Sequence, residues 1–209
     1  MKARPASSLL VFVAVLGLAA AGCSDDGAHA RSGGGSASGP GSAAGGTAAA
    51  DVPKGVAAQY ATVAQEIAAE GGAKESGEWR VAYIVEPAEP WFEPDGEGYR
   101  FREPAGGETH HIEIIPFERE TGRILPGVPI RLEVVGGDGR VIDAKDLNFY
   151  YSEFFHYANN FVVPQAGAYT LRATLQAPRF FRHGEQAAGP ALAQGATVEF
   201  TGVELRPES

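Results

Sequence analysis

Two histidines and a glutamate lie close together in GETHHIEII, the stretch that runs from residue 107 to residue 115. In a β-strand, side chains two residues apart share a face, so His111 and Glu113 point one way while Ile112 and Ile114 point the other. An imidazole and a carboxylate side by side can bind one divalent ion, or the carboxylate can orient the imidazole. We therefore predict that the isoleucines face a core and that His111 and Glu113 lie on the opposite, more solvated face.

Other histidines extend this candidate site. His156 lies in the aromatic-rich segment YSEFFHYANN, which we interpret as a connection between strands, and His183 lies in the later segment PRFFRHGE. A lone histidine is more often a hydrogen-bonded loop residue than a ligand. A β-sandwich can nevertheless gather such segments, and three imidazoles with one carboxylate suit a borderline transition metal. The predicted metal site therefore consists of His111, Glu113, His156 and His183, whereas His110 shares the parity of the isoleucines and is predicted to be structural.

The elements that must position these residues alternate apolar and polar side chains, with turn residues about every ten positions. The predicted strands are 79–85, 109–117, 128–135, 141–144, 148–151, 161–163, 168–177 and 196–205. No helical pattern interrupts them, which is typical of an antiparallel sandwich or barrel. The stretch GAYTL around Tyr169 resembles a tyrosine corner, in which a tyrosine bonds back to the preceding connection. It favours an all-β, immunoglobulin-like antiparallel β-sandwich.

The start of the chain has the layout of a secreted lipoprotein. Residues 1–22 carry Lys2 and Arg4, then an apolar run and small residues, as in a signal peptide. They end in AAAGCSD, which resembles a bacterial lipobox, so Cys23 is predicted to be lipidated and to anchor the protein in a membrane. Cys23 is also the only cysteine, which excludes an intrachain disulfide and a cysteine metal site.

Two further segments precede the predicted sandwich. Residues 23–50 are rich in Gly, Ser and Ala and are predicted to be a flexible tether. Residues 51–75 are predicted to hold a short helix that ends at Gly71 and Gly72, and residues 76–209 to form the β-sandwich metal-binding domain. Loss of Lys2 and Arg4 with the signal peptide takes the formal charge from −9 to about −11, which argues against nucleic acid as a partner.

From Val81 to about Leu205, some three fifths of the chain, the sequence resembles the periplasmic ferrous-iron transport protein family. These are small immunoglobulin-like metal-binding proteins that work beside an iron permease. The resemblance excludes the tether and the first helix. It rests on Val81-Ala82-Tyr83 with Glu86-Pro87, His111-x-Glu113, Ser152-Glu153 before His156-Tyr157 with Asn160 beyond, Gly167-x-Tyr169, Pro178 and Arg182-His183.

The resemblance implies that His111, His156 and His183 are metal ligands, with Glu113 at the position of a neighbouring carboxylate. In the family a methionine seven residues before the middle histidine joins them, and that position is Phe149 here. A thioether favours Cu(I), so its loss should leave a harder site. We expect a divalent transition metal, iron or copper first, with zinc or manganese as further candidates.

Three functions are compatible with these features. The first is a lipid-anchored, periplasmic or extracytoplasmic metal-binding protein of the bacterial cell envelope that supports a membrane iron permease, with a homodimer as a candidate assembly. The alternative is a metal-independent immunoglobulin-like lipoprotein for adhesion or assembly. An oxygen-dependent enzyme is disfavoured, because a cupin-type site would carry a second histidine at the position of Glu113. No catalytic triad, phosphate loop or flavin motif is present, so we expect a binding protein and not an enzyme.

Overall fold

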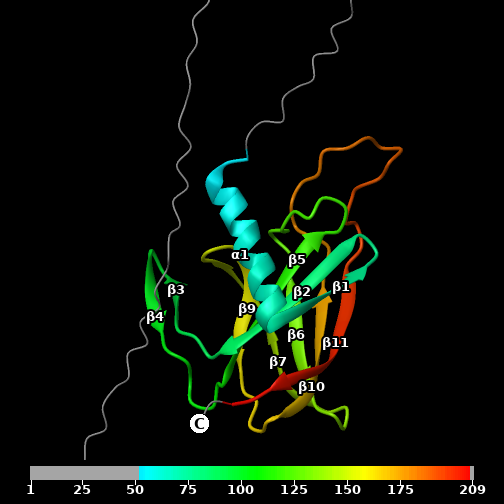
Figure 1. The fold of residues 1–209 in the computed structure, drawn as a ribbon. Helices are drawn as coiled ribbons and strands as arrows, with labels where there is room; N and C mark the ends of the chain where they lie inside the picture. The colour runs from blue at the N-terminus through cyan, green and yellow to red at the C-terminus, as the bar shows by residue number, and fades with distance from the viewer. Residues whose placement is uncertain (1–51, 208–209) are drawn as a thin grey trace, which may run out of the picture. The chain divides into compact units, whose positions relative to one another are not determined.

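The computed structural model describes residues 52–207, so the predicted signal peptide, Cys23 and the tether lie outside the described residues. Within this range one helix precedes eleven strands (Figure 1). Their bounds are α1 (Lys54–Glu70), β1 (Gly71–Ser76), β2 (Trp79–Pro87), β3 (Trp91–Asp95), β4 (Gly98–Arg102), β5 (His110–Glu118), β6 (Ile130–Val135), β7 (Val141–Asp146), β8 (Asn148–Tyr151), β9 (Phe155–Phe161), β10 (Gly167–Leu175) and β11 (Ala196–Leu205). Over the described residues, the search for a helix with the length and apolarity to cross a membrane found none.

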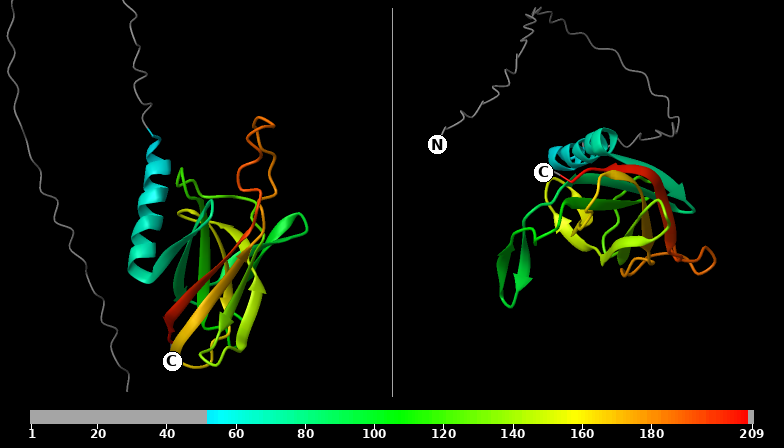
Figure 2. Two further views of the ribbon diagram at one scale, coloured as in Figure 1. Left: turned by 90° about the vertical axis from the view of Figure 1, so that its right-hand side faces the viewer. Right: turned by 90° about the horizontal axis from the view of Figure 1, so that it is seen from below.

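Two antiparallel sheets pack face to face. The first has five strands in the order β1-β2-β5-β9-β8, and the second has four in the order β11-β10-β6-β7. Strands β3 and β4 pair only with each other and project from the sandwich as a hairpin (Figures 1 and 2). The structure therefore confirms the predicted immunoglobulin-like antiparallel β-sandwich.

The inner faces of the two sheets form the main core. Ile112 and Ile114 of β5 are fully buried there, as their strand parity predicted, together with Leu132 of β6 and Leu171 of β10. Tyr169 contributes its ring to this core and donates its hydroxyl to the Gln165 carbonyl at 2.7 Å. The predicted tyrosine corner is therefore present, and it holds the connection before β10 against the sandwich.

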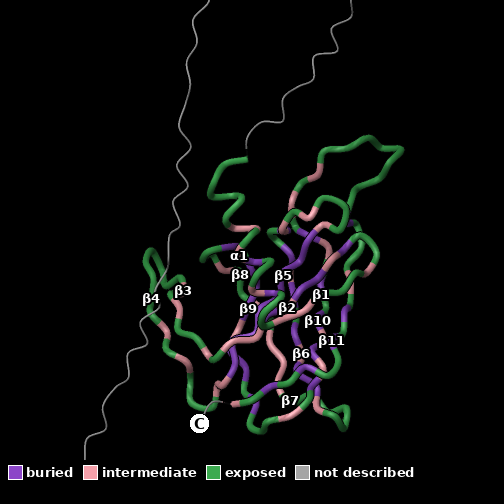
Figure 3. The backbone as a smooth tube through the Cα atoms, in the orientation of Figure 1, coloured by how far each residue is buried: buried purple, intermediate pink, exposed green. Residues whose placement is uncertain are grey.

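Helix α1 covers part of the outer face of the five-stranded sheet. Val63 and Ile67, one helical turn apart, pack against a second apolar cluster that includes Ile115 and Phe117 of β5. The Tyr60 hydroxyl accepts a hydrogen bond from the Ile124 amide at 3.0 Å, which ties the helix to the segment after β5. Strand β5 is consequently buried on both faces, as its purple colour in Figure 3 shows.

This double burial corrects one prediction about His111 and Glu113. The face they share was expected to be solvated, yet their exposed fractions are 2% and 5%. The alternation of residues identified the correct side of the strand, but the sequence did not show that other elements would cover that side. His110 is buried on the inner side, with its Nδ1 2.8 Å from the Thr109 hydroxyl, in keeping with the structural role predicted for it.

Other boundaries also differ from the predicted ones. The segment interpreted as a connection before Phe161 is mostly strand β9, because its aromatic residues suit a pleated surface and pair with β8. Helix α1 ends at Glu70, directly before the predicted stop at Gly71 and Gly72, but β1, which no pattern predicted, follows at once. A Cβ at Gly71 would lie 1.9 Å from the Tyr83 carbonyl oxygen, so only glycine allows this close approach to β2.

The tyrosine corner can be tested with Tyr169→Phe, which removes the hydroxyl and keeps the buried ring. We expect the free energy of unfolding to fall by about 1 kcal/mol, the usual worth of such a hydrogen bond, in urea denaturation. Tyr99→Phe is the matched control, because Tyr99 is 76% exposed. Equal stabilities of Tyr169→Phe and the unmodified protein would contradict a stabilising corner.

Candidate metal centre

Strands β5 and β9 bring three of the four predicted ligands together. The two strands are antiparallel neighbours with His111 opposite Asn160 and Glu113 opposite Ala158. Since His156 lies two residues before Ala158, its side chain leaves the same outer face of the sheet. His111, Glu113 and His156 each offer one ligand atom, and these atoms lie within 4.8 Å of one another. The spacing is that of ligands that can share one ion.

Hydrogen bonds determine which nitrogen each imidazole presents. The Asn160 amide nitrogen donates to the Glu89 carbonyl at 2.7 Å, so its Oδ1 is the acceptor that lies 2.8 Å from His111 Nδ1. His156 Nδ1 likewise lies 3.3 Å from the Phe154 carbonyl. Each Nδ1 therefore carries the proton, and each Nε2 is left with a free lone pair. Histidine ligands of metals are generally held by such a second hydrogen bond.

Burial keeps these groups uncharged when no ion is present. It lowers the pKa of His111, and it lowers that of His156 to about 4 with help from His111. It also raises the pKa of Glu113 to about 8, and the carboxylate of Glu86 adds to this shift. The 3.4 Å contact between His156 Nε2 and Glu113 Oε1 is thus a contact of neutral groups near pH 7. Glu113 Oε2 is buried and has no hydrogen-bond partner among residues 52–207, so this oxygen is available as a metal ligand.

The three residues lie in a cavity of about 840 Å³. Five glutamates from separate segments line it, and neither lysine nor arginine is among its described lining residues. The glutamates are Glu66, Glu86, Glu89, Glu113 and Glu153. Burial and, to a smaller extent, repulsion from Glu89 and Glu66 together raise the pKa of Glu86 to about 7. A cation that entered this cavity would offset that repulsion.

Phe149 stands at the position that the resemblance assigns to a methionine, but its ring is not the one that packs on His156. Phe149 pairs with Tyr157 across β8 and β9, and its ring lies against Phe155 and Tyr157. The next residue, Tyr150, is the one opposite His156, and the two rings stack with centroids 5.4 Å apart. Phe149 also lines the cavity, but it is 46% exposed. Counting seven residues back from His156 gives Phe149, but in the structure the ring beside His156 is that of Tyr150.

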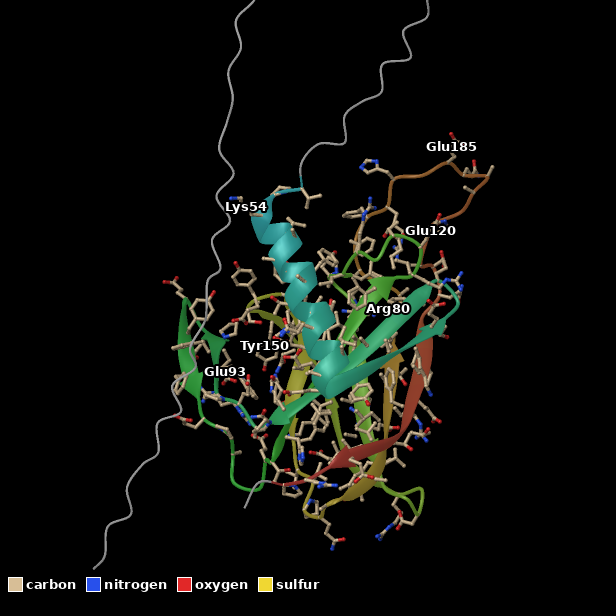
Figure 4. All side chains as sticks on the ribbon, viewed as in Figure 1. Lys54, Arg80, Glu93, Glu120, Tyr150 and Glu185 are labelled. Atoms are coloured by element: carbon tan, nitrogen blue, oxygen red, sulfur yellow. The ribbon has the colours of Figure 1, made fainter. Side chains whose placement is uncertain are left out.

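His183 is the predicted ligand that the chain does not bring to the centre. It is exposed in the connection between β10 and β11 and is not part of the group of ligand atoms. Figure 4 shows Glu185, two residues after His183, at the outer tip of this loop and well away from Tyr150. Within one chain, therefore, three of the four predicted residues form the candidate site.

Residues that the sequence analysis did not place in the site support it from outside. Asn160 belonged to the resemblance but had no role assigned, and its contact with His111 depends on the register between β5 and β9. Glu108 accepts hydrogen bonds from Arg102, from the Ala105 amide and from Lys145, and its side chain is 5% exposed. Burial alone would raise the pKa of Glu108, but these bonds outweigh it and lower the pKa to about 2.

Comparisons with known proteins identify the fold. No protein-family model and no curated protein matches the chain. A copper-bound variant of P19 from Campylobacter jejuni is 18% identical with a TM-score of 0.54, over 67% of this chain and 98% of that one. Copper-reconstituted P19 is 19% identical with a TM-score of 0.52, over 66% and 96%. A copper-bound variant of FetP from uropathogenic Escherichia coli is 20% identical with a TM-score of 0.50, over 66% and 94%. At these identities the likeness establishes a shared fold.

Asn160 provides a test of the hydrogen bond that orients His111. Asn160→Ala should lower the affinity for a divalent ion such as Cu(II) by about 10- to 100-fold, because His111 loses the acceptor that fixes its ring. Asn159→Ala is the matched control, since that side chain donates to the Asp146 carbonyl and accepts from the Asn160 backbone amide, and Asn159 is opposite Ile112 and not His111. Isothermal titration would measure both, and equal affinities would contradict the role of Asn160.

Glu108 gives a test that depends on pH. Its folded pKa of about 2 lies below its ordinary value of 4.5, so the ionised form stabilises the fold fully above about pH 4.5. That stabilisation is lost as the pH falls through about 2. Glu108→Gln should cost about 2 kcal/mol at pH 7, and the difference should shrink on acidification, unlike that of the exposed control Glu103→Gln. A difference that did not change with pH would contradict this.

Proposed function

We propose that this protein is a metal-binding lipoprotein of the bacterial cell envelope, related to the periplasmic ferrous-iron transport proteins. The observation that carries the proposal is the convergence of His111, Glu113 and His156 within 4.8 Å. Both imidazoles are already oriented by other hydrogen bonds, and Glu113 has a buried oxygen with no hydrogen-bond partner among the described residues. An ion would supply what these three groups lack.

The donor set narrows the choice of metal. Imidazole with carboxylate suits Fe(II), Cu(II), Zn(II) and Mn(II), and no described residue of the centre offers a thioether or thiolate for Cu(I). In a test tube copper should bind most tightly, whatever ion is carried in the cell, because that is the general affinity order. The P19 and FetP structures of the same fold are copper-bound, which supports this expectation.

We propose carriage of the ion, and not catalysis, as the role of this centre. Three protein ligands leave a coordination position open, through which a receiving protein can take the ion by ligand exchange. The acidic cavity raises the local concentration of cations. Anchored through Cys23, the protein would support iron uptake by a membrane permease. If His183 is also a ligand, its exposed position requires that it serve a second copy of the chain, which ties that prediction to the predicted homodimer.

A metal-independent role in adhesion or assembly is the second candidate. The observation in its favour is a set of exposed aromatic residues on the β3–β4 hairpin, Phe92, Tyr99 and Phe101. Such side chains are typical anchors of protein contacts. This candidate does not explain why three titratable groups are buried together on β5 and β9.

Metal titration of the purified protein tests the proposal. His111→Ala and His156→Ala should each weaken Cu(II) and Fe(II) binding by more than the roughly 100-fold that supporting residues can cost, because each removes a ligand. His29→Ala, in the predicted tether, is the control and should bind as the unmodified protein does. Unchanged stoichiometry and affinity in both ligand variants would exclude this centre and leave the metal-independent role.

Tryptophan fluorescence tests where the ion binds. The chain has two tryptophans, and the Trp91 ring lies 6.2 Å from that of His111. Trp79 pairs with Glu118, seven residues along β5 from His111 and thus about 23 Å away. Cu(II) should therefore quench the Trp91 emission and spare that of Trp79. Trp91→Phe should abolish the quenching, whereas quenching that persists in this variant would place the ion elsewhere.

A further inference from the structure

We infer that the β3–β4 hairpin is part of the metal centre, with Arg102 acting as a positioning residue that holds Trp91 against His111 and so retains the ion. This inference rests on the proposed metal binding. The hairpin is outside the sandwich, and most of its residues are exposed (Figure 3). Because its strands pair only with each other, the contacts at its base decide where it lies.

Arg102 makes the central contact at that base. Trp91 begins β3 and Arg102 ends β4, and they are opposite each other in the hairpin register. The guanidinium lies over the indole ring, 4.2 Å from its centroid, in a cation–π contact. Arginine suits this place because its flat group can stack on a ring and still donate hydrogen bonds at its edge.

Glu108 fixes the other side of Arg102. Arg102 Nη2 lies 2.8 and 2.9 Å from the two Glu108 carboxylate oxygens, and the Ala105 amide and Lys145 also donate to this group. The Glu108 side chain is 5% exposed, so the pair is shielded from solvent. Charge-assisted bonds in such surroundings are among the stronger polar contacts in proteins. These contacts therefore fix the base of the hairpin relative to the sandwich.

The same carboxylate is connected to the metal ligand His111. Asn160 Nδ2 lies 3.4 Å from Glu108 Oε2, while Asn160 Oδ1 accepts from His111 Nδ1 at 2.8 Å. On the other side, the Trp91 ring contacts the rings of His111 and Tyr150, with centroids 6.2 and 5.7 Å away. Two chains of contacts thus connect Glu108 to His111. One runs through Asn160, and the other runs through Arg102 and Trp91.

The consequence is a wall on one side of the acidic cavity. Trp91 lines the cavity together with Phe92, Pro94 and Tyr99 of the same hairpin. While Arg102 holds it in place, the indole limits the approach of water and competing ligands to the open side of the centre. Releasing the hairpin should therefore speed the loss of the ion more than it lowers the stability of the sandwich, to whose two apolar clusters the hairpin does not contribute.

Transfer of Cu(II) from the loaded full chain to a coloured chelator, followed by stopped flow, tests this inference. Arg102→Ala should release Cu(II) about tenfold faster, at the lower end of the range for supporting residues. It should also change the Cu(II) spectrum and reduce quenching of Trp91. Arg102→Lys keeps the charge but not the flat stacked group, so it should restore the slow release only in part. The matched control is Arg100→Ala, on the same hairpin, whose ion pairs with Glu93 and Asp95 are exposed.

A second variant guards against an Arg102→Ala protein that fails to fold. Trp91→Ala leaves Arg102 and Glu108 in place and should also release Cu(II) faster. The inference would be overturned if Trp91→Ala released Cu(II) at the unmodified rate. It would also be overturned if Arg102→Ala folded, released Cu(II) at that rate and kept its Trp91 emission unaltered. The comparison with His111→Ala separates the two hypotheses. If His111→Ala still binds Cu(II) as the unmodified protein does, the proposed function is wrong. If His111→Ala loses Cu(II) binding as expected but Trp91→Ala releases Cu(II) at the unmodified rate, only the role of the hairpin is rejected.

Discussion

The burial of polar groups on the central strand β5 is the constraint on which the rest of the site depends. His111 and Glu113 are almost without solvent contact, although an imidazole and a carboxylate are costly to bury. The strand tolerates them because the imidazoles stay neutral and donate Nδ1 protons to oxygen acceptors, while the carboxylic acid keeps its proton. One carboxyl oxygen of Glu113 nevertheless has no hydrogen-bond partner in the described part of the chain. A bound cation would complete this set of interactions.

Elements outside the sandwich create that burial. Helix α1 covers the far end of β5 through Val63 and Ile67, and the β3–β4 hairpin covers the near end through Trp91. Both approach the outer face of the five-stranded sheet and leave the acidic cavity between them. The sandwich core on the other face is an ordinary apolar one, so it provides a rigid base from which the ligands project.

The position that the resemblance assigned to a methionine is better understood with the strands in place. A hairpin of β8 and β9 puts Tyr150 and not Phe149 beside His156. Tyr150 and Trp91 thus surround the two imidazoles with aromatic rings, and the only donors among the three clustered ligands are nitrogen and oxygen. This composition favours ions of intermediate hardness.

Sequence alone determined much of this protein, because alternation and turn residues are local properties. It gave the sandwich, the tyrosine corner at Tyr169, the inward isoleucines of β5 and the shared face of His111 and Glu113. It predicted strands at 148–151 and 161–163 and only a connection between them for the segment that carries His156, because an aromatic run resembles a connection until a partner strand is known. What only the tertiary structure decided was which distant residues meet: that Asn160 lies opposite His111, that Glu108 joins Arg102, and that His183 lies apart. Register and packing between distant segments decide those contacts, and neither is a property of any short stretch of sequence.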